Sequence, residues 1–183
     1  MYVRRVDRTE LARRIYDAAH LTGTFTLRSG VVSHEYFDKY RFESDPRLLR
    51  DIAASCAALV PHGVDALAGL ELGGVPLATM ISQTTRLPAV YVRKQAKSYG
   101  TCRLAEGAEI DDRRLCIVED VVTSGGAVLD AASELRARGA RLGPVICVID
   151  RESGGRDKLA AVDLELFALY TMSELSAAAA AGA

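Results

Sequence analysis

Residues 116–140, CIVEDVVTSGGAVLDAASELRARGA, decide the fold. An apolar run ends in two carboxylates, Glu119 and Asp120, and a turn with Thr123, Ser124 and two glycines follows before a helical pattern begins. Glycines let the backbone approach a ligand closely, and the amides at a helix N-terminus point toward an anion. The turn therefore predicts a phosphate site, although Gly-Gly before a helix also occurs as a plain turn.

The two acids must bind a different chemical group from the one that binds in the turn. A carboxylate repels phosphate, but it accepts strong hydrogen bonds from the hydroxyls of a sugar or binds a metal ion. A phosphate in the turn and a diol on the acids together describe a ribose 5-phosphate. The turn matches neither G-x-G-x-x-G nor G-x-x-x-x-G-K-[ST], so it predicts neither a dinucleotide site nor an NTPase loop.

The segments around this stretch alternate between strand and helix patterns. Expected strands cover residues 64–71, 88–94, 113–120, 142–152 and 162–170. Expected helices cover residues 44–60, 74–87, 124–140 and about 156–161, with a last helix from Ser173. Such alternation implies crossover connections and a mainly parallel sheet flanked by helices. Ligands bind at the carboxyl ends of such strands, where Glu119 and Asp120 stand.

The first part of the chain has a different pattern. A helix is expected over residues 7–21, with Asp7 or Thr9 as its cap. The segments 24–30 and 34–42 are rich in aromatic and β-branched residues and are expected to be strands.

Length and composition indicate a soluble globular chain. We expect one domain over residues 1–183, with an α/β core at 46–175 and an alanine-rich tail at 176–183. The net charge of -1 predicts no general attraction for nucleic acid or anionic membrane. No apolar stretch approaches the roughly 20 residues of a membrane span. The N-terminus lacks the apolar centre of a signal peptide, so a cytoplasmic location is expected.

The four cysteines are Cys56, Cys102, Cys116 and Cys147, and none forms a C-x-x-C pair. A zinc site or a disulfide framework is therefore not expected. Cys116 and Cys147 lie in apolar runs, which predicts buried free thiols.

The stretch CIVEDVVTSGGAVLDA resembles the phosphoribosyl pyrophosphate (PRPP) motif of type I phosphoribosyltransferases. Five further segments resemble orotate phosphoribosyltransferases in their order: FTLRSG, EYFDKYRF, GLELGGVPLAT, VRKQAKSYGT and VIDRESGG. This resemblance covers roughly residues 24–175 and implies the type I fold, with a small N-terminal hood from residues 1–45 over the base site. It implies transfer of the phosphoribosyl group from PRPP to orotate, with Mg²⁺ carried by PRPP and no dedicated protein metal site.

The resemblance also implies roles for the matching residues. Glu119 and Asp120 would hold the ribose hydroxyls, with Asp120 as a catalytic residue. Thr123 would face orotate beside Arg151, whose planar fork suits a carboxylate or a carbonyl edge. Without the resemblance, an ion pair with Glu152 is the simpler interpretation of Arg151. The loop around the 5'-phosphate would consist of Val121, Val122, Thr123, Ser124, Gly125, Gly126 and Ala127.

Residues 93–109 resemble the family's flexible catalytic loop, which implies a homodimer whose loops reach the partner's site. Arg93 and Lys94 would bind pyrophosphate oxygens, and Lys97 would be the chief stabiliser of the departing charge. A solvated basic loop is the plain alternative for such a run. Tyr99 would contact PRPP where many relatives have histidine, but a phenol carries protons poorly near neutral pH.

Further positions depart from the family pattern or allow two interpretations. Gly73 stands where relatives carry lysine and would offer only its backbone to pyrophosphate. Arg28 occupies a place often held by lysine or serine, near the base or the diphosphate. Tyr36 and Phe37 would either stack over the base or pack within a strand hairpin.

Two other functions remain open at this point. The chain could transfer the phosphoribosyl group to another base, or it could sense PRPP and regulate transcription without catalysis. Against a regulator, the loop cations are present and the sequence has no helix-turn-helix or basic recognition segment.

Overall fold

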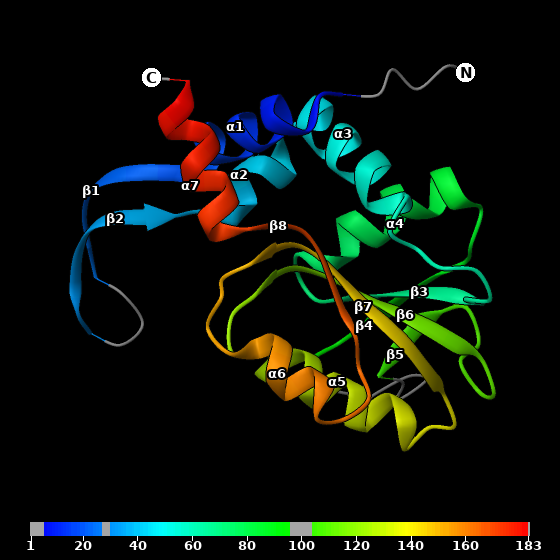
Figure 1. The fold of residues 1–183 in the computed structure, drawn as a ribbon. Helices are drawn as coiled ribbons and strands as arrows, with labels where there is room; N and C mark the ends of the chain where they lie inside the picture. Colours follow the sequence, from blue (N-terminus) through cyan, green and yellow to red (C-terminus); the bar gives the residue numbers. More distant parts are fainter. Residues whose placement is uncertain (1–5, 27–29, 96–103, 183) are drawn as a thin grey trace.

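The computed structural model describes residues 6–26, 30–95 and 104–182 (Figure 1). Four residues named in the sequence analysis lie outside the described residues: Arg28, Lys97, Tyr99 and Cys102. The helices are α1 Arg8–Ala19, α2 Lys39–Ser44, α3 Pro46–Ala57, α4 Gly74–Thr85, α5 Gly126–Arg136, α6 Gly155–Ala160 and α7 Met172–Ala181. The strands are β1 His20–Thr26, β2 Val32–Phe37, β3 Ala66–Leu70, β4 Ala89–Val92, β5 Ala105–Gly107, β6 Arg114–Val122, β7 Arg141–Asp150 and β8 Leu166–Thr171.

The central sheet has the strand order β5-β4-β3-β6-β7-β8. All neighbouring pairs are parallel except β4 and β5, and this confirms the predicted mainly parallel sheet. The apolar strands β6 and β7 are interior strands of the sheet and are buried over most of their length, as strands covered on both faces must be. The sheet therefore brings the carboxyl ends of β3, β6 and β7 to one edge.

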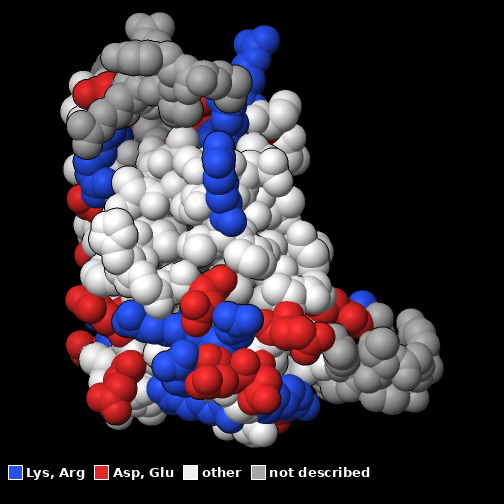
Figure 2. Space-filling model, turned by 90° about the vertical axis from the view of Figure 1, so that its right-hand side faces the viewer, with Lys and Arg blue, Asp and Glu red and all other residues white. Residues whose placement is uncertain are grey.

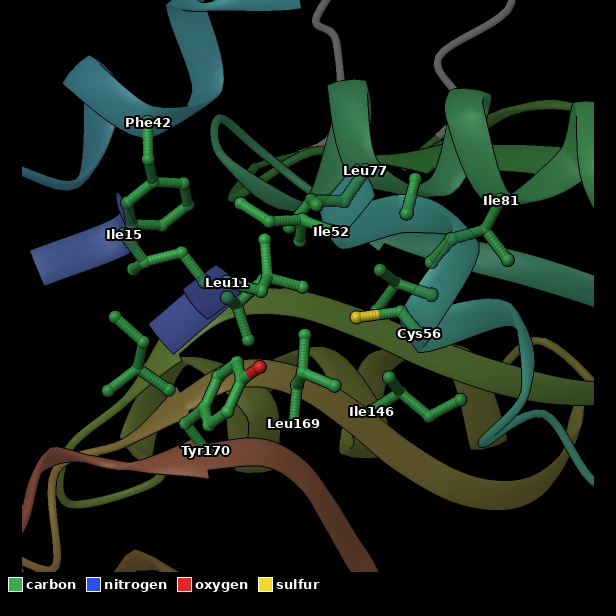
Figure 3. Packing of buried hydrophobic residues seen from close by; sticks show 14 of the residues in the cluster. Leu11, Ile15, Phe42, Ile52, Cys56, Leu77, Ile81, Ile146, Leu169 and Tyr170 are labelled. Atoms are coloured by element: carbon green, nitrogen blue, oxygen red, sulfur yellow. The ribbon is translucent and has the colours of Figure 1, made fainter. Parts of the chain in front are cut away.

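Helices cover both faces of the sheet, and α5 and α6 lie on the opposite face from α3 and α4 (Figure 1). Alternate residues of β6 belong to different cores because successive side chains of a strand point to opposite faces. Cys116 and Val118 pack with α3 and α4, whereas Leu115 and Ile117 pack with α5. Figure 3 shows the first of these cores, which α1, α2 and α7 complete.

The N-terminal residues form α1 and a separate hairpin of β1 and β2. Asp7 caps α1 by accepting a hydrogen bond from the backbone N–H of Glu10, at 2.9 Å, so Asp7 is the cap of the two candidates. The expected strand over 34–42 is wrong in its second half, because β2 ends at Phe37 and α2 follows. Asp38 starts this helix by accepting from the N–H of Tyr40, and Phe42 is buried in the core shown in Figure 3.

Two other segments differ from or extend the sequence interpretation. The polar segment after β4 contains a short edge strand, β5, which the sequence analysis did not predict. The alanine-rich tail is helical to Ala181, and a capping box between Thr171 and Glu174 starts α7.

Cys116 and Cys147 are buried free thiols, as predicted. Within the described ranges, no helix combines the length and the apolar character needed to cross a membrane.

Figure 2 shows the molecule from the right-hand side of Figure 1. Acidic and basic side chains are mixed along its lower edge, and the area above them is mainly uncharged apart from a column of basic side-chain atoms at its upper middle (Figure 2). A surface that binds nucleic acid usually carries a continuous basic stripe. This face has no such stripe among the residues drawn in colour.

Candidate active site

A cleft of about 800 Å³ opens at the carboxyl ends of the parallel strands. Its walls come from the end of β6 and the start of α5, from the turn after β7, from β3 and β4, and from the hairpin and α2. The described residues that line it are Phe37, Lys39, Tyr40, Leu70, Glu71, Leu72, Val92, Arg93, Lys94, Leu104, Glu119, Val121, Val122, Thr123, Ser124, Gly125, Gly126, Ala127, Val128, Asp130, Ala131, Glu134 and Arg151. The cleft thus collects the predicted phosphate loop, one of the two acids and Arg151.

The loop between β6 and α5 has the backbone of an anion site. Gly125 is the N-cap of α5 and has a φ of 77°, which glycine adopts without steric cost. No side chain caps this helix, so the amides of its first turn face the cleft without a competing carboxylate or hydroxyl. Thr123 and Ser124 are exposed beside these amides. The loop can therefore bind a phosphate through N–H and O–H donors together.

A second glycine turn supports the loop from behind. A Cβ at Gly155 would overlap the carbonyl oxygen of Thr123 and would lie 3.1 Å from the backbone nitrogen of Gly125. The backbone N–H of Arg151 donates to the carbonyl of Val122, at 2.8 Å. The VIDRESGG segment therefore both carries Arg151 and packs against the phosphate loop, and the last glycine is required by that packing.

Asp150 holds the turn that presents Arg151. Its buried carboxylate accepts from the backbone N–H of Glu152 at 2.9 Å and from Nε and Nη2 of Arg156 at 3.2 and 3.1 Å. The carboxylate of Glu152 accepts from Ser173 at the start of α7, and so it faces away from the cleft. The guanidinium of Arg151 instead lies 5.9 Å from the ring centre of Phe37.

The two aromatic residues of β2 have different surroundings. Phe37 lines the cleft beside Arg151, which suits stacking over a planar base. Tyr36 packs against Phe25 within the hairpin, with ring centres 5.4 Å apart. Tyr36 thus packs within the hairpin, whereas stacking of Phe37 over the base stays a prediction.

The two acids at the end of β6 have different surroundings. Glu119 is 7% exposed and lines the cleft, whereas Asp120 is 0% exposed and faces α2 and α4. Glu119 is the acid that lines the cleft, and the direct contact of Asp120 with the ribose hydroxyls stays a prediction.

Asp120 contacts residues that the sequence analysis gave no role. The ammonium of Lys39, from α2, lies 2.5 Å from Oδ2 of Asp120. A Cβ at Gly73 would overlap the same carboxylate oxygen and would lie 2.7 Å from Oε1 of Glu43. Gly73 therefore makes room for a carboxylate, which explains why no side chain stands there. Lys39 and Glu43 were missed because their segment was interpreted as a strand, although their spacing places both on one side of a helix.

The protonation states follow from burial and proximity. Burial raises the pKa of Glu119 well above its usual value, and the neighbouring Asp120 raises it further. Burial and Asp120 likewise raise the pKa of Glu43 to about 9. Burial alone would raise the pKa of Asp120, but hydrogen bonding from Glu119, Lys39 and Glu43 lowers it. Of the three carboxyl groups, Asp120 is the one whose pKa is lowered, and Lys39 is its counter-ion.

Basic side chains stand at the opposite wall of the cleft, at the end of β4. Arg93 pairs with Glu106 at 3.9 Å, and the backbone N–H of Lys94 donates to Oε1 of Glu71. Both Arg93 and Lys94 line the cleft, as expected of residues that bind pyrophosphate.

Comparison with known proteins agrees with this site. Residues 42–167 match the phosphoribosyl transferase domain family. The orotate phosphoribosyltransferase of Nocardioides sp. (strain JS614) is 55% identical over 173 residues, which are 94% of this chain and 97% of the relative. This chain belongs to the orotate phosphoribosyltransferase family.

The family assignment extends to distant relatives and to solved structures. The Methanosarcina acetivorans orotate phosphoribosyltransferase is 47% identical over 84% of this chain and 82% of its own length. The crystal structure of the Mycobacterium tuberculosis orotate phosphoribosyltransferase in complex with PRPP superposes with a TM-score of 0.80. It is 27% identical and covers 92% of this chain and 98% of its own. The type I phosphoribosyltransferase fold expected from the sequence is thereby confirmed.

Proposed function

We propose that the cleft transfers the 5-phosphoribosyl group from PRPP to orotate, which gives orotidine 5'-monophosphate and pyrophosphate for pyrimidine nucleotide synthesis. The main support is the distribution of charge along the cleft. The uncapped start of α5 provides amides for the 5'-phosphate, and Glu119 stands beside it for the ribose hydroxyls. Arg151 over Phe37 provides a cation and an aromatic face for a flat, carboxylated base.

The order of groups in PRPP suggests where the base would lie. With the 5'-phosphate at residues 123–127 and the ribose at Glu119, the base would lie toward Arg151 and Phe37. Thr123 belongs to the phosphate loop and lines the same cleft. A guanidinium can pair with the orotate carboxylate through two parallel hydrogen bonds, which uracil cannot offer.

The chemistry is mainly electrostatic. As the bond between C1 and the pyrophosphate oxygen breaks, the ring gains positive charge and the leaving group gains negative charge. Glu119 stabilises the ring through its hydroxyls, and Arg93 and Lys94 bind the leaving group. We propose that Lys97 supplies the largest share of the stabilisation of the leaving group, roughly 3–4 kcal/mol by analogy with a single oxyanion-hole donor.

Magnesium fits this site as a companion of PRPP. No group of three metal-ligating side chains occurs among the residues whose placement is described. Glu119 is the cleft-lining carboxylate beside the proposed ribose position, and together with diphosphate oxygens it suits Mg²⁺, which keeps several waters and binds few protein groups. When bound, the ion would neutralise part of the charge on the departing pyrophosphate.

The test is the loss of orotate's ultraviolet absorbance when the protein is mixed with PRPP and Mg²⁺. Orotate should be consumed, whereas uracil, hypoxanthine and adenine should not be. Consumption of a different base would favour a transferase with another acceptor. Binding of PRPP without consumption of any base would favour a non-catalytic PRPP sensor and contradict the proposal.

A further inference from the structure

Lys39 is a cation of the cleft that lies outside the PRPP motif and the catalytic loop. It is the first residue of α2, and its side chain is 33% exposed and lines the cleft. Its ammonium lies 2.5 Å from Oδ2 of Asp120, which is completely buried. One end of this ion pair therefore faces the substrate volume while the other end is held inside the protein.

The surroundings of Asp120 fix that ammonium. Oε1 of Glu43 and Oδ2 of Asp120 are both buried, and the ammonium of Lys39 is the cation that pairs with Oδ2. The space that a Cβ of Gly73 would fill adjoins both oxygens. The high pKa of Glu43 means that its carboxyl carries a proton near neutral pH, so it can share this proton with Asp120. Asp120 thereby keeps a single negative charge that is left to balance Lys39.

Lys39 also lies beside the loop between β3 and α4, and this loop leads to the wall of the cleft that carries Arg93 and Lys94. Gly73, against Asp120, and Glu71, which accepts from the N–H of Lys94, are two residues apart between β3 and α4. The loop thus runs from the Lys39 side of the cleft to the Lys94 side. A diphosphate lying over it would meet a cation at each end.

We propose that Lys39 binds the diphosphate of PRPP, and that Asp120 and Glu43 are positioning residues that hold its ammonium at the cleft wall. This inference rests on the proposed function. PRPP is a polyanion, and the carboxylate of Asp120 would repel its diphosphate if no cation stood between them. A lysine that is already held in place needs no rearrangement when the ligand arrives, which makes it more effective than a free side chain.

The test compares PRPP binding to Lys39→Met, Lys39→Arg and a control. Lys39→Met keeps most of the apolar stem and removes the charge. Arg14→Met is the matched control, because Arg14 pairs with Asp51 at 2.8 Å with a similar exposure of 31% but does not line the cleft. Calorimetry with PRPP and Mg²⁺ measures affinity without orotate, and steady-state kinetics separates the KM values for PRPP and orotate.

Lys39→Met should weaken PRPP binding by about 10- to 100-fold, the range for loss of one charge-assisted hydrogen bond. The KM for orotate should change less than about twofold, because a cation that binds only the diphosphate contributes to PRPP affinity alone. Lys39→Arg should recover part of the affinity, and Arg14→Met should bind like the wild type. Unchanged PRPP affinity in a folded Lys39→Met protein would overturn the inference.

A second neutral variant guards against loss of folding. If Lys39→Met does not fold, Lys39→Gln is measured instead, and failure of both to fold would assign Lys39 a structural role and overturn the inference. The two proposals fail separately. Wild-type protein that binds PRPP but consumes no orotate contradicts the proposed function only, whereas normal turnover with unchanged PRPP affinity in Lys39→Met contradicts this inference only.

Discussion

Glu119 and Asp120 are adjacent in the chain and have different surroundings. Glu119 lines the cleft, and Asp120 is enclosed by Lys39, Glu43 and the backbone of Gly73. We propose that the pair divides two tasks in binding PRPP: the first acid faces the ribose hydroxyls, and the second acts on the diphosphate through Lys39.

Gly73→Ala tests whether the space beside Asp120 is needed. The new Cβ would overlap Oδ2 of Asp120, so we expect the free energy of unfolding to fall by about 1–3 kcal/mol, a usual cost of overpacking. PRPP affinity should also fall, because the displaced carboxylate no longer holds Lys39. Gly126→Ala is the control for stability in denaturant melts, since its Cβ would meet nothing nearer than 3.9 Å. Equal stability of the two variants would contradict the packing described for Gly73.

Glu43→Gln tests the protonation of the cluster. The pKa of Glu43 is raised to about 9 in the folded protein, so its contribution to stability is fully present below pH 4.5 and is lost as the pH rises toward 9. Glutamine cannot ionise and can donate to Asp120 at any pH. The variant should therefore lose less stability than the wild type between pH 5 and pH 9 in denaturant titrations. Parallel pH profiles for the two proteins would show that Glu43 ionises normally.

At the scale of elements, the site depends on two turns that pack against each other. The phosphate loop after β6 and the turn after β7 meet at Gly155, and the Asp150–Arg156 pair fixes the second turn. A change in one turn should therefore affect ligands bound by the other. The contact is local, and it joins the site for the 5'-phosphate to the residue proposed to bind the base.

Gly155→Ala should disturb both substrate sites at once. Its Cβ would overlap the carbonyl oxygen of Thr123, which must move together with the start of α5. We expect the KM values for PRPP and for orotate to rise together, in contrast to the selective effect of Lys39→Met. Ala160→Gly, in the same helix but exposed, serves as the control in the same kinetic assay. A normal KM for PRPP in Gly155→Ala would show that the loop does not depend on this contact.

The elements differ in how far the sequence determines them. The motif at 116–131 predicted strand, turn and helix because all of its residues are neighbours in the chain and each follows a local rule of period or capping. The segment 38–44 was misread because aromatic residues favour a strand locally, whereas burial of Phe42 and the cap by Asp38 favour a helix in the folded protein. Strand β5 was missed because three residues at a sheet edge carry too little pattern.

The same distinction applies to the site. Glu119 and the phosphate loop could be predicted because they belong to a recognisable strand end and glycine turn, whereas the role of Arg151 was predicted from the family resemblance. Lys39 and Glu43 could not, because their partner Asp120 is distant in the chain and becomes a neighbour only when α2 packs against α4 and β6. The i,i+4 spacing of Lys39 and Glu43 was the available signal, but it required the segment to be identified as a helix first.

At the scale of the whole molecule, we propose a cytoplasmic homodimer in which the loop at 93–109 completes the partner's site. Mixing two inactive variants tests this. A Lys97→Ala protomer and a Glu119→Gln protomer would each lack one part of the site, so a mixed dimer should regain one intact site and a measurable fraction of orotate turnover. No recovery after mixing and refolding would indicate that each chain completes its own site.

The position of PRPP tests the account most directly, and a crystal structure of the protein with PRPP and Mg²⁺ measures it. We expect the 5'-phosphate at the amides of residues 124–127, the ribose hydroxyls at Glu119 and the diphosphate beside Lys39. A structure in which PRPP binds elsewhere and leaves the turn between β6 and α5 empty would contradict the account.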